Sequence, residues 1–430
     1  MISLKLSFVT LGCKVNQYES QEIAESLARH SFTLAKKGEE AQIYIVNSCT
    51  VTAESDRKTR QNVRRLRQKH PDAIIVLTGC MPQAFPDSAR ELPADIIIGN
   101  KNNTDLPKLL EQFIKAQEKI VCISEHRSGD KFLGSGITCF EGHTRAFLKI
   151  QDGCDRFCSY CAIPYARGRS RSKPLEDIRA ELARLAGAGY LEVVFVGINL
   201  SNYGRDINLS LADAVRAAQE TEGIRRIRLG SLEPDHITEE LLSELSLCDK
   251  LCPQFHISLQ SGCNNTLKRM NRHYTAEEFM QLALNIRRSF RLASITTDII
   301  CGFPGETDED FMQTLEFAKR LQPDKAHIFP YSPRSATRAA SFDGKIESSV
   351  KELRCRLLSE ECEKSRRQQM KKLIGQKCKV LFETPKGGLQ CGYTENYTPV
   401  ELESDTCLCG EIREVLITDA KEDCVRALLI

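Results

Sequence analysis

Residues 151–172 read QDGCDRFCSYCAIPYARGRSRS and follow directly on an apolar stretch. Within this segment, Cys154, Cys158 and Cys161 have the spacing C-x-x-x-C-x-x-C. Three thiolates on one short loop can bind three irons of a [4Fe–4S] cubane. The fourth iron then has no protein ligand and stays open to another molecule. A structural cluster or a zinc site would need a fourth ligand, and Cys139 is the only cysteine near enough in the chain to supply it.

The cysteine loop opens a series of alternating apolar and amphipathic segments, which predict strands and helices in turn. The predicted strands are Ala146–Ile150, Glu192–Val196, Arg226–Leu229, Gln254–Leu259, Ser294–Ile300 and Ala326–Tyr331. The predicted helices are Leu175–Leu185, Thr238–Leu247, Ala276–Arg288 and Asp308–Leu321. Right-handed crossovers would build a partial (β/α)6 version of the eight-stranded barrel. The cysteine loop would then lie at the carboxyl ends of the strands, where such barrels bind their substrates.

Residues 1–120 show the same alternation, which predicts another parallel α/β sheet. Its predicted strands are Leu6–Leu11, Gln42–Val46, Ala73–Leu77 and Asp95–Ile98, and its predicted helices include Glu19–His30 and Ala53–Lys69. Cys13, Cys49 and Cys80 each come just after one of the first three strands. Ligands of open α/β sheets bind beyond the carboxyl ends of the strands, so we expect these thiols to share a metal site.

The last part of the chain has a different pattern. Val350–Leu373 predicts a charged helix, and short apolar stretches after it predict strands with Gly387-Gly388 as a hairpin turn. These strands are Lys377–Glu383, Leu389–Tyr393, Thr398–Leu402, Glu411–Thr418 and Cys424–Leu429. They fit a small antiparallel barrel. We therefore expect an α/β protein with domains at 1–120, 144–366 and 367–430 and a connector at 121–143.

The composition is that of a globular protein, with 41% hydrophobic and 27% charged residues among 430 and a net charge of +2. No stretch approaches the roughly 20 apolar residues of a membrane helix. The opening MISLKLSFVTLGC is too short, and with Lys5 too charged, for an export signal, so we expect a cytoplasmic protein. Most of the 19 cysteines should then be reduced. Those expected to be small buried apolar side chains are Cys248, Cys252, Cys355, Cys378, Cys391, Cys407, Cys409 and Cys424.

The motif of Cys154, Cys158 and Cys161, with aromatic Tyr160 before the last cysteine, resembles the signature of the radical S-adenosylmethionine enzymes. In that family the open iron chelates S-adenosylmethionine, and one electron releases a 5′-deoxyadenosyl radical. The cofactor supplies this chemistry, and the protein positions the substrate and excludes water. Arg167 could steer an anionic substrate or simply lie solvated on the loop. The residues that the resemblance suggests as cofactor contacts are Tyr160, Gly197, Asn199, Ser231, Glu233, Gln260 and Asp298.

Three further motifs resemble the amino-terminal domain of the methylthiotransferases. They are TLGCKVNQYES at 10–20, VNSCTVTAESDRKTRQ at 46–61 and LTGC at 77–80. In that family the cysteines of these motifs, here Cys13, Cys49 and Cys80, bind a second [4Fe–4S] cluster whose open iron handles the sulfur to be inserted. The resemblance covers essentially the whole chain, since the terminal barrel resembles the TRAM module. The departures, GCMPQ after the third motif and Cys263 in place of serine, touch no predicted ligand.

The family divides between enzymes that act on tRNA and enzymes that act on a ribosomal protein. The TRAM-like barrel favours RNA, because small barrels of this kind bind single strands. Two basic clusters agree with RNA binding, although a basic helix is often only a solvated surface. The clusters consist of Arg57, Lys58, Arg60, Arg64, Arg65 and Arg67, and of Arg366, Arg367, Lys371 and Lys372.

Lys14-Val15, SLQSG…MNRHYT and PYSPR resemble the branch that acts on N6-threonylcarbamoyladenosine next to the anticodon. The isopentenyladenosine branch typically has glutamine-methionine at 14–15, and the ribosomal-protein branch has proline-lysine. The resemblance therefore implies methylthio insertion at C2 of threonylcarbamoyladenosine in the tRNA anticodon loop. It also implies two [4Fe–4S] clusters, S-adenosylmethionine, a sulfur donor and a reductant protein such as flavodoxin or ferredoxin. The alternatives are the same reaction on isopentenyladenosine tRNA or on a ribosomal protein, and a non-enzymatic iron–sulfur RNA-binding redox sensor.

Overall fold

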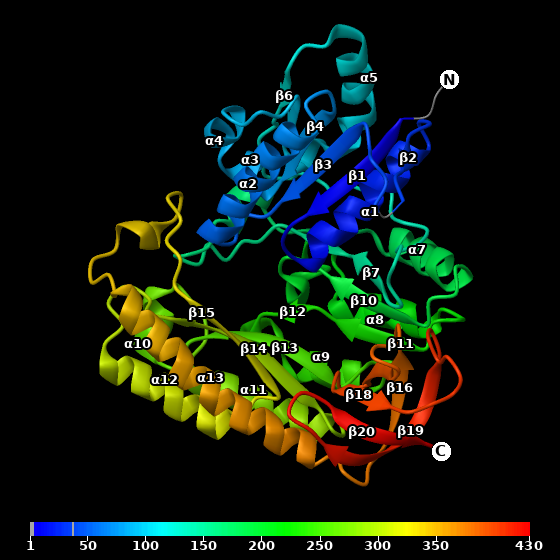
Figure 1. Cartoon of the computed structure of the whole chain (residues 1–430). Coiled ribbons are helices and arrows are strands. Elements are labelled where there is room, and N and C mark those ends of the chain that lie inside the picture. Colours follow the sequence, from blue (N-terminus) through cyan, green and yellow to red (C-terminus); the bar gives the residue numbers. More distant parts are fainter. Residues whose placement is uncertain (1–3, 37) are drawn as a thin grey trace.

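A computed structural model describes residues 4–36 and 38–430, and it confirms the predicted α/β architecture (Figure 1). The amino-terminal sheet lies above the central strands, and the carboxyl-terminal barrel packs against one end of them. Residues 1–3 of the opening segment lie outside the described part. Within 4–36 and 38–430, no helix has the length and apolarity needed to cross a membrane.

The amino-terminal sheet is parallel, with its strands in the order β2-β1-β3-β4-β5-β6. The strands are β1 Lys5–Thr10, β2 Thr33–Leu34, β3 Ile43–Ser48, β4 Ile74–Gly79, β5 Ile96–Ile98 and β6 Ile120–Cys122. The helices are α1 Lys14–Ala28, α2 Ala53–Lys69, α3 Cys80–Ala84, α4 Pro86–Arg90, η1 Asn100–Asp105 and α5 Leu106–Ala116. Apolar clusters cover both faces, so β3 is buried along its whole length. The sequence did not predict β2 and β6, because edge strands this short show no periodicity.

The start of the first helix also differs from the prediction. The apolar pattern placed it at Glu19, whereas α1 begins at Lys14 with Cys13 as its N-cap. The helix therefore begins directly after the predicted ligand Cys13. A helix amino terminus favours negative charge, which suits a thiolate at this position.

The central strands form two parallel sheets, β11-β10-β7 and β12-β13-β14-β15. They are β7 Ala146–Lys149, β10 Glu192–Val196, β11 Arg226–Leu229, β12 Ser231–Leu232, β13 Gln254–Gln260, β14 Ser294–Cys301 and β15 Lys325–Pro330. All the predicted strands are present, but the ladder is broken between β11 and β13. The chain turns at Gly230 and resumes as β12, and a single bridge between Ile227 and Leu251 spans the break. A short hairpin, β8 Gln151–Asp152 with β9 Arg171–Ser172, frames the cysteine loop.

Most helices of this part of the chain cover the outer side of these strands, whereas the one at Ile163–Arg167 packs on α3. The helices are α6 Ile163–Arg167, α7 Leu175–Gly187, α8 Leu211–Glu220, α9 Glu239–Ser246, α10 Asn264–Arg269, α11 Ala276–Ser289, α12 Asp308–Leu321 and α13 Ser348–Lys371, with the 3₁₀ turns η2 Leu200–Asn202, η3 Arg205–Ile207, η4 Pro234–His236 and η5 Arg338–Ser341. Thr275 and Thr307 begin α11 and α12 with capping boxes, in which a side chain three residues on bonds back to the cap. Helix α13 runs through the predicted boundary at 366–367.

The carboxyl-terminal strands close into a barrel in the order β16-β17-β18-β20-β19. They are β16 Lys377–Phe382, β17 Gln390–Thr394, β18 Pro399–Leu402, β19 Ile412–Ala420 and β20 Val425–Leu429. Gly387 and Gly388 both have positive φ (56° and 81°) and form the predicted hairpin turn. The small barrel predicted from the strand pattern is therefore confirmed.

Two arginines of β11 dock this barrel on the central strands. Arg226 donates to the backbone oxygen of Lys379 at 2.5 Å, and Arg228 donates to that of Glu395 at 3.0 Å. The Arg228 guanidinium is held by the buried carboxylate of Glu192, 2.9 Å from its Nε. We call this contact the arginine clasp.

The scattered cysteines divide into three groups. Cys252, Cys378 and Cys424 are buried as predicted, and Cys248, Cys355 and Cys391 are half-buried. For Cys407 and Cys409 the prediction is wrong, because both are exposed. They lie in the loop between β18 and β19, outside the barrel core.

Candidate functional site

The loop that carries Cys154, Cys158 and Cys161 begins after β8 and returns through α6 to β9. Cys158 is buried, and the other two cysteines are half-buried. Burial raises the pKa of Cys154 to about 12. The pKa of Cys161 is raised by burial and by the charges of Cys158 and Cys154, so these thiols lie within range of one another. Thiols with such pKa values become thiolates when a metal binds and releases their protons.

The thiols of Cys154, Cys158 and Cys161 suit a [4Fe–4S] cubane better than a single metal ion. In the part of the chain that the structure describes, no three Cys, His, Asp or Glu side chains converge closely enough to hold one metal ion. A cubane takes each thiolate on a different iron, so its ligands stand further apart. Cys139 lies elsewhere, with its backbone N–H donating to Glu25 Oε1 at 3.2 Å.

Gly79 and Gly153 each precede a predicted ligand cysteine, and neither has room for a Cβ atom. Their φ angles are +98° and +72°. A Cβ would lie 2.4 Å from the Ser48 backbone oxygen at Gly79 and 1.9 Å from the Arg169 backbone oxygen at Gly153. Close backbone packing therefore fixes the direction in which each cysteine leaves its strand.

We expect Gly79→Ala and Gly153→Ala each to lose the iron of one site. Each variant should hold about four irons per chain after reconstitution, where the unchanged chain holds about eight. Iron analysis with electron paramagnetic resonance of the reduced protein measures this. Gly187→Ala, where no atom lies within 4 Å of an added Cβ, is the control and should keep all its iron. Full iron content in both alanine variants would contradict the expectation.

A buried arginine contacts the cysteine loop from a distant part of the chain. Arg272 Nη1 donates to Cys158 Sγ at 3.2 Å. Its guanidinium also pairs with Glu233, and its Nε donates to Tyr274 Oη at 3.1 Å. Such a donor stabilises the negative charge of a thiolate ligand. Sequence reasoning missed Arg272, although it lies within the quoted MNRHYT, because only the folded chain brings it to Cys158.

The predicted cofactor contacts near the first strands also contact other parts of the protein, and their binding of a cofactor stays a prediction. Tyr160 packs edge-on against Phe303, with ring centroids 6.3 Å apart. Gly197 and Asn199 both contact Gln151. A Cβ atom at Gly197 would lie 2.8 Å from Gln151 Oε1, so a side chain at this position would displace that oxygen. The Asn199 N–H donates to the same oxygen at 2.7 Å. These two residues therefore shape the end of β10.

The remaining predicted contacts lie at the ends of the following strands. Glu233 is brought to the cysteine loop through its pair with Arg272. Ser231 is exposed on β12, and Gln260 ends β13 with a φ of 65°, a left-handed conformation that is strained outside glycine. Asp298 lies 3.2 Å from His256 Nε2. Their contact with a cofactor stays a prediction.

Cys13, Cys49 and Cys80 come together at the carboxyl ends of β1, β3 and β4. Cys49 and Cys80 are buried, and Cys13 is exposed. Burial raises the pKa of Cys80 to about 12, with smaller contributions from the charges of Cys49 and Cys13. Burial and the charge of Cys13 raise the pKa of Cys49. The sequence expectation that these thiols converge is therefore supported, and their role as ligands stays a prediction.

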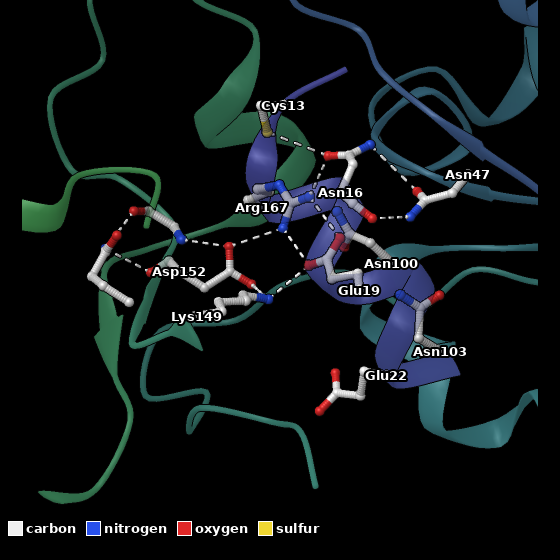
Figure 2. A network of polar contacts seen from close by, with 12 residues as sticks. Cys13, Asn16, Glu19, Glu22, Asn47, Asn100, Asn103, Lys149, Asp152 and Arg167 are labelled. Atoms are coloured by element: carbon white, nitrogen blue, oxygen red, sulfur yellow. Dashed lines mark hydrogen bonds and ion pairs between the residues drawn. The ribbon is translucent and has the colours of Figure 1, made fainter. Parts of the chain in front are cut away.

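An asparagine next to Cys13 holds these loops in place (Figure 2). Asn16 is fully buried, and its Nδ2 donates to the backbone oxygens of Leu11 at 3.0 Å and Ser48 at 2.8 Å. Its backbone oxygen accepts from Asn47 Nδ2 at 2.9 Å. Asn16 thus ties the loop before Cys13 to the loop before Cys49. The motif TLGCKVNQYES contains it, but the sequence showed no reason for it.

Arg167 is buried, so the expectation of a solvated loop arginine is wrong, and its steering of an anionic substrate stays a prediction. Its side chain is 1% exposed and forms a bidentate pair with Glu19 (2.6 and 2.9 Å). Figure 2 shows it between Asn16 and Asp152. Helix α6, which ends at Arg167, packs on α3, which begins at Cys80. The two cysteine sites are therefore in direct contact through these helices.

Comparison with known proteins identifies the family. Residues 5–99 match the uncharacterized protein family UPF0004, and residues 148–318 match the Radical SAM superfamily. A relative in Thermotoga maritima, named threonylcarbamoyladenosine tRNA methylthiotransferase MtaB, is 38% identical over 96% of this chain and 94% of its own length. The chain belongs to the radical S-adenosylmethionine methylthiotransferases. It is thus an enzyme that transfers a sulfur-containing group, which argues against the non-enzymatic alternative.

Other similarities agree with this assignment. A tRNA-2-methylthio-N(6)-dimethylallyladenosine synthase of Pelotomaculum thermopropionicum is 33% identical over 97% of this methylthiotransferase and 96% of its own chain. A solved structure of TsrM from Kitasatospora setae, a radical S-adenosylmethionine methyltransferase, has a TM-score of 0.57 and 14% identity over 79% of this chain and 77% of that chain. This last likeness shows the fold alone. Membership of the family implies S-adenosylmethionine and a [4Fe–4S] cluster as cofactors.

Proposed function

We propose that this methylthiotransferase inserts a methylthio group at C2 of N6-threonylcarbamoyladenosine next to the tRNA anticodon. The observation that carries the proposal is similarity along the chain to relatives named for this reaction, which are 34–38% identical over 91–96% of the chain. Relatives named for the dimethylallyladenosine reaction are 33–34% identical. The difference in identity is small, so the argument for the substrate also needs the site.

The predicted ligands are Cys154, Cys158 and Cys161 for the radical cluster and Cys13, Cys49 and Cys80 for a second [4Fe–4S] cluster. When bound, these groups and S-adenosylmethionine supply the radical, the methyl group and the sulfur. Residues of the chain itself stabilise and shield the groups at this site. Arg272 donates to Cys158 Sγ and stabilises its negative charge. Tyr160 and Phe303 form an apolar contact beside the loop, which limits access of water to the radical.

Lys14 supplies a physical reason for the threonylcarbamoyl substrate, which carries a carboxylate that an isopentenyl group lacks. It is the first residue of α1, directly after Cys13, and its Nζ lies 5.9 Å from the Phe147 ring. The side chain is exposed, and within the described residues it has no hydrogen bond or ion pair. Although Lys14 reaches the surface, desolvation by the neighbouring protein and the charges of Arg145 and Arg228 lower its pKa to about 8, and Glu192 acts in the opposite direction. Arg145 and Arg228 already pair with Glu192, so Lys14 is the cation that a bound carboxylate would stabilise.

We expect Lys14→Gln to lower kcat/KM for tRNA that carries threonylcarbamoyladenosine by about 10- to 100-fold, the range for loss of a charged hydrogen bond. The same variant should lose much less on tRNA that carries isopentenyladenosine. Lys14→Arg, which keeps the charge, should retain most of the activity. Iron content, measured alongside, controls for damage at Cys13. An equal loss on both tRNAs would contradict a role in carboxylate recognition.

For RNA binding we propose the barrel and the exposed face of α2. Arg64 and Arg65 are exposed on this helix, whereas Arg67 pairs with Asp95 at 2.5 Å. Surface arginines of this kind bind phosphates and make affinity depend on salt. The second basic cluster behaves differently from the prediction. Its Arg366 and Arg367 pair with acidic residues at 422–423 of the barrel, so these cations hold α13 to the barrel.

The most direct test is mass spectrometry of tRNA nucleosides from a strain that lacks this gene. The proposal expects loss of the methylthio group from threonylcarbamoyladenosine, its return on complementation, and unchanged isopentenyladenosine products. Loss from isopentenyladenosine alone, or an unchanged tRNA profile with a ribosomal protein left unmodified, would overturn it. We place the reaction in the cytoplasm, where tRNA is found, with a reductant protein and a sulfur donor as further partners.

A further inference from the structure

The Arg167 side chain lies inside a buried network of charges that joins the two cysteine sites (Figure 2). Its Nη1 donates to Glu19 Oε1 at 2.6 Å and to Asp152 Oδ1 at 3.2 Å, and its Nη2 donates to Glu19 Oε2 at 2.9 Å. Lys149 Nζ contacts the same two carboxylates, at 2.7 and 2.8 Å. Arg171 Nη2 contacts Asp152 at 2.9 Å. Each of these side chains is less than one tenth exposed.

The direct contacts of this network contain one more positive charge than negative charge. Within the described residues they join three cations, Arg167, Lys149 and Arg171, to two carboxylates, Glu19 and Asp152. Each cation has a carboxylate partner, but three buried cations share two carboxylates, and the nearby Glu22, whose pKa burial raises to about 7, adds only part of a negative charge. The network therefore favours an anion beside it. A [4Fe–4S]²⁺ core with three thiolate ligands has a net charge of −1 and would balance the excess.

One N–H group of this network, on Arg167, has no hydrogen-bond acceptor among the described residues. Four N–H groups of Arg167 are on the two Nη atoms, which bind Glu19, Asp152 and Asn16, whereas the buried Nε has no partner. Buried N–H groups are almost always paired, so this one calls for an acceptor that the described residues do not supply. Arg167 and Cys80 lie close enough for each to influence the pKa of the other. Cys80 also begins α3, on which the helix of Arg167 packs.

We propose that Arg167 binds the second cluster, with its Nε–H donating to a cluster sulfur or to the Cys80 thiolate. This inference rests on the proposed function, in which Cys13, Cys49 and Cys80 hold that cluster. Through its bidentate pair with Glu19 and its bond to Asn16, Arg167 connects the cluster to α1, whose N-cap is Cys13. Hydrogen bonds to the sulfurs and positive charge both raise the reduction potential of an iron–sulfur cluster. Arg167 therefore makes the second cluster easier to reduce.

The first experiment measures that potential with the second cluster alone. The full chain with Cys154, Cys158 and Cys161 replaced by alanine is reconstituted and titrated with dithionite under electron paramagnetic resonance. Adding Arg167→Gln should shift the midpoint to a more negative potential, and Arg167→Lys should shift it less. Arg169→Gln is the matched control, because Arg169 is exposed on the same loop and should leave the midpoint unchanged. A cluster that loads in Arg167→Gln with an unshifted midpoint would overturn the proposal.

The second experiment needs no change at Arg167 and so covers a variant that fails to load. The same single-cluster chain is labelled with ¹⁵N-arginine, and pulsed electron paramagnetic resonance of the reduced cluster measures coupling to ¹⁵N. We expect a coupling that disappears in Arg167→Lys. The reciprocal chain, without Cys13, Cys49 and Cys80, is the positive control, because Arg272 donates to Cys158 there. A loaded second cluster without ¹⁵N coupling refutes the role of Arg167. No cluster at all in the single-cluster chain refutes the proposed second site instead.

Discussion

Replacing Cys13, Cys49 and Cys80 together by alanine should abolish methylthio insertion while leaving cleavage of S-adenosylmethionine within about twofold of the unchanged enzyme. The two cysteine sets lie on different loops, and the proposed function assigns the radical chemistry to a cofactor at Cys154, Cys158 and Cys161. Loss of the sulfur-handling cluster therefore separates the two steps. Iron content should fall from about eight to about four per chain. Liquid chromatography of 5′-deoxyadenosine and of tRNA nucleosides measures both steps in one reaction.

The matched control is the reciprocal replacement of Cys154, Cys158 and Cys161. It should remove cleavage and insertion together, also at about four irons per chain. A further control replaces Cys252, which is buried just before β13 and belongs to neither loop, and should change neither step. Methylthio product from the chain without Cys13, Cys49 and Cys80 would show that these cysteines do not carry the sulfur.

Glu181→Ala should destabilise the protein by about 3–5 kcal/mol, the range for removing one partner of a buried charge pair. Glu181 is fully buried on α7 and pairs with the buried Lys173. It also accepts from Tyr18 Oη at 2.8 Å and from the Ile137 N–H at 3.0 Å. Alanine would leave one buried cation and two buried donors unpaired. Because Tyr18 belongs to α1, the change would also loosen the amino-terminal sheet from the central strands.

Urea unfolding followed by circular dichroism measures this loss. Glu316→Ala is the control, since its pair with Lys319 on α12 is exposed and solvent already screens it. Its unfolding midpoint should stay close to that of the unchanged protein. Equal midpoints for Glu181→Ala and Glu316→Ala would show that the buried network contributes nothing to stability.

The positions of the ligand cysteines could be predicted from sequence because they depend on local pattern. An apolar strand followed by Gly-Cys places a thiol at the carboxyl edge of a parallel sheet, and Cys13, Cys80 and Cys154 all follow this rule. The strand order needed only the alternation of strands and helices and the right-handed crossover. The break between β11 and β13 was not visible, because it depends on a turn at Gly230 that leaves no periodic signal.

The residues around the cysteines could not be predicted, because their partners lie far away in the chain. Arg167 meets Glu19 across 148 positions, and Arg272 meets Cys158 across 114. Seen in sequence alone, a buried arginine and a solvated one look the same. At residues 366–367 the sequence suggested exposed basic side chains, whereas the structure pairs them with acidic residues. Two of the four residues in a basic cluster that suggested RNA pair with acidic residues more than 50 positions later.

The arginine clasp bears on how this enzyme can evolve. Arg226 and Arg228 grip the barrel by its peptide oxygens, which every residue type possesses. Exchange of barrel side chains therefore leaves these two contacts in place, although the acidic residues at 422–423 also hold the barrel to α13. Under the proposed RNA-binding role, variation at that surface would change which RNA loop is bound without changing these two backbone contacts. The side chains that would bind RNA and the backbone contacts that position the barrel can therefore vary independently.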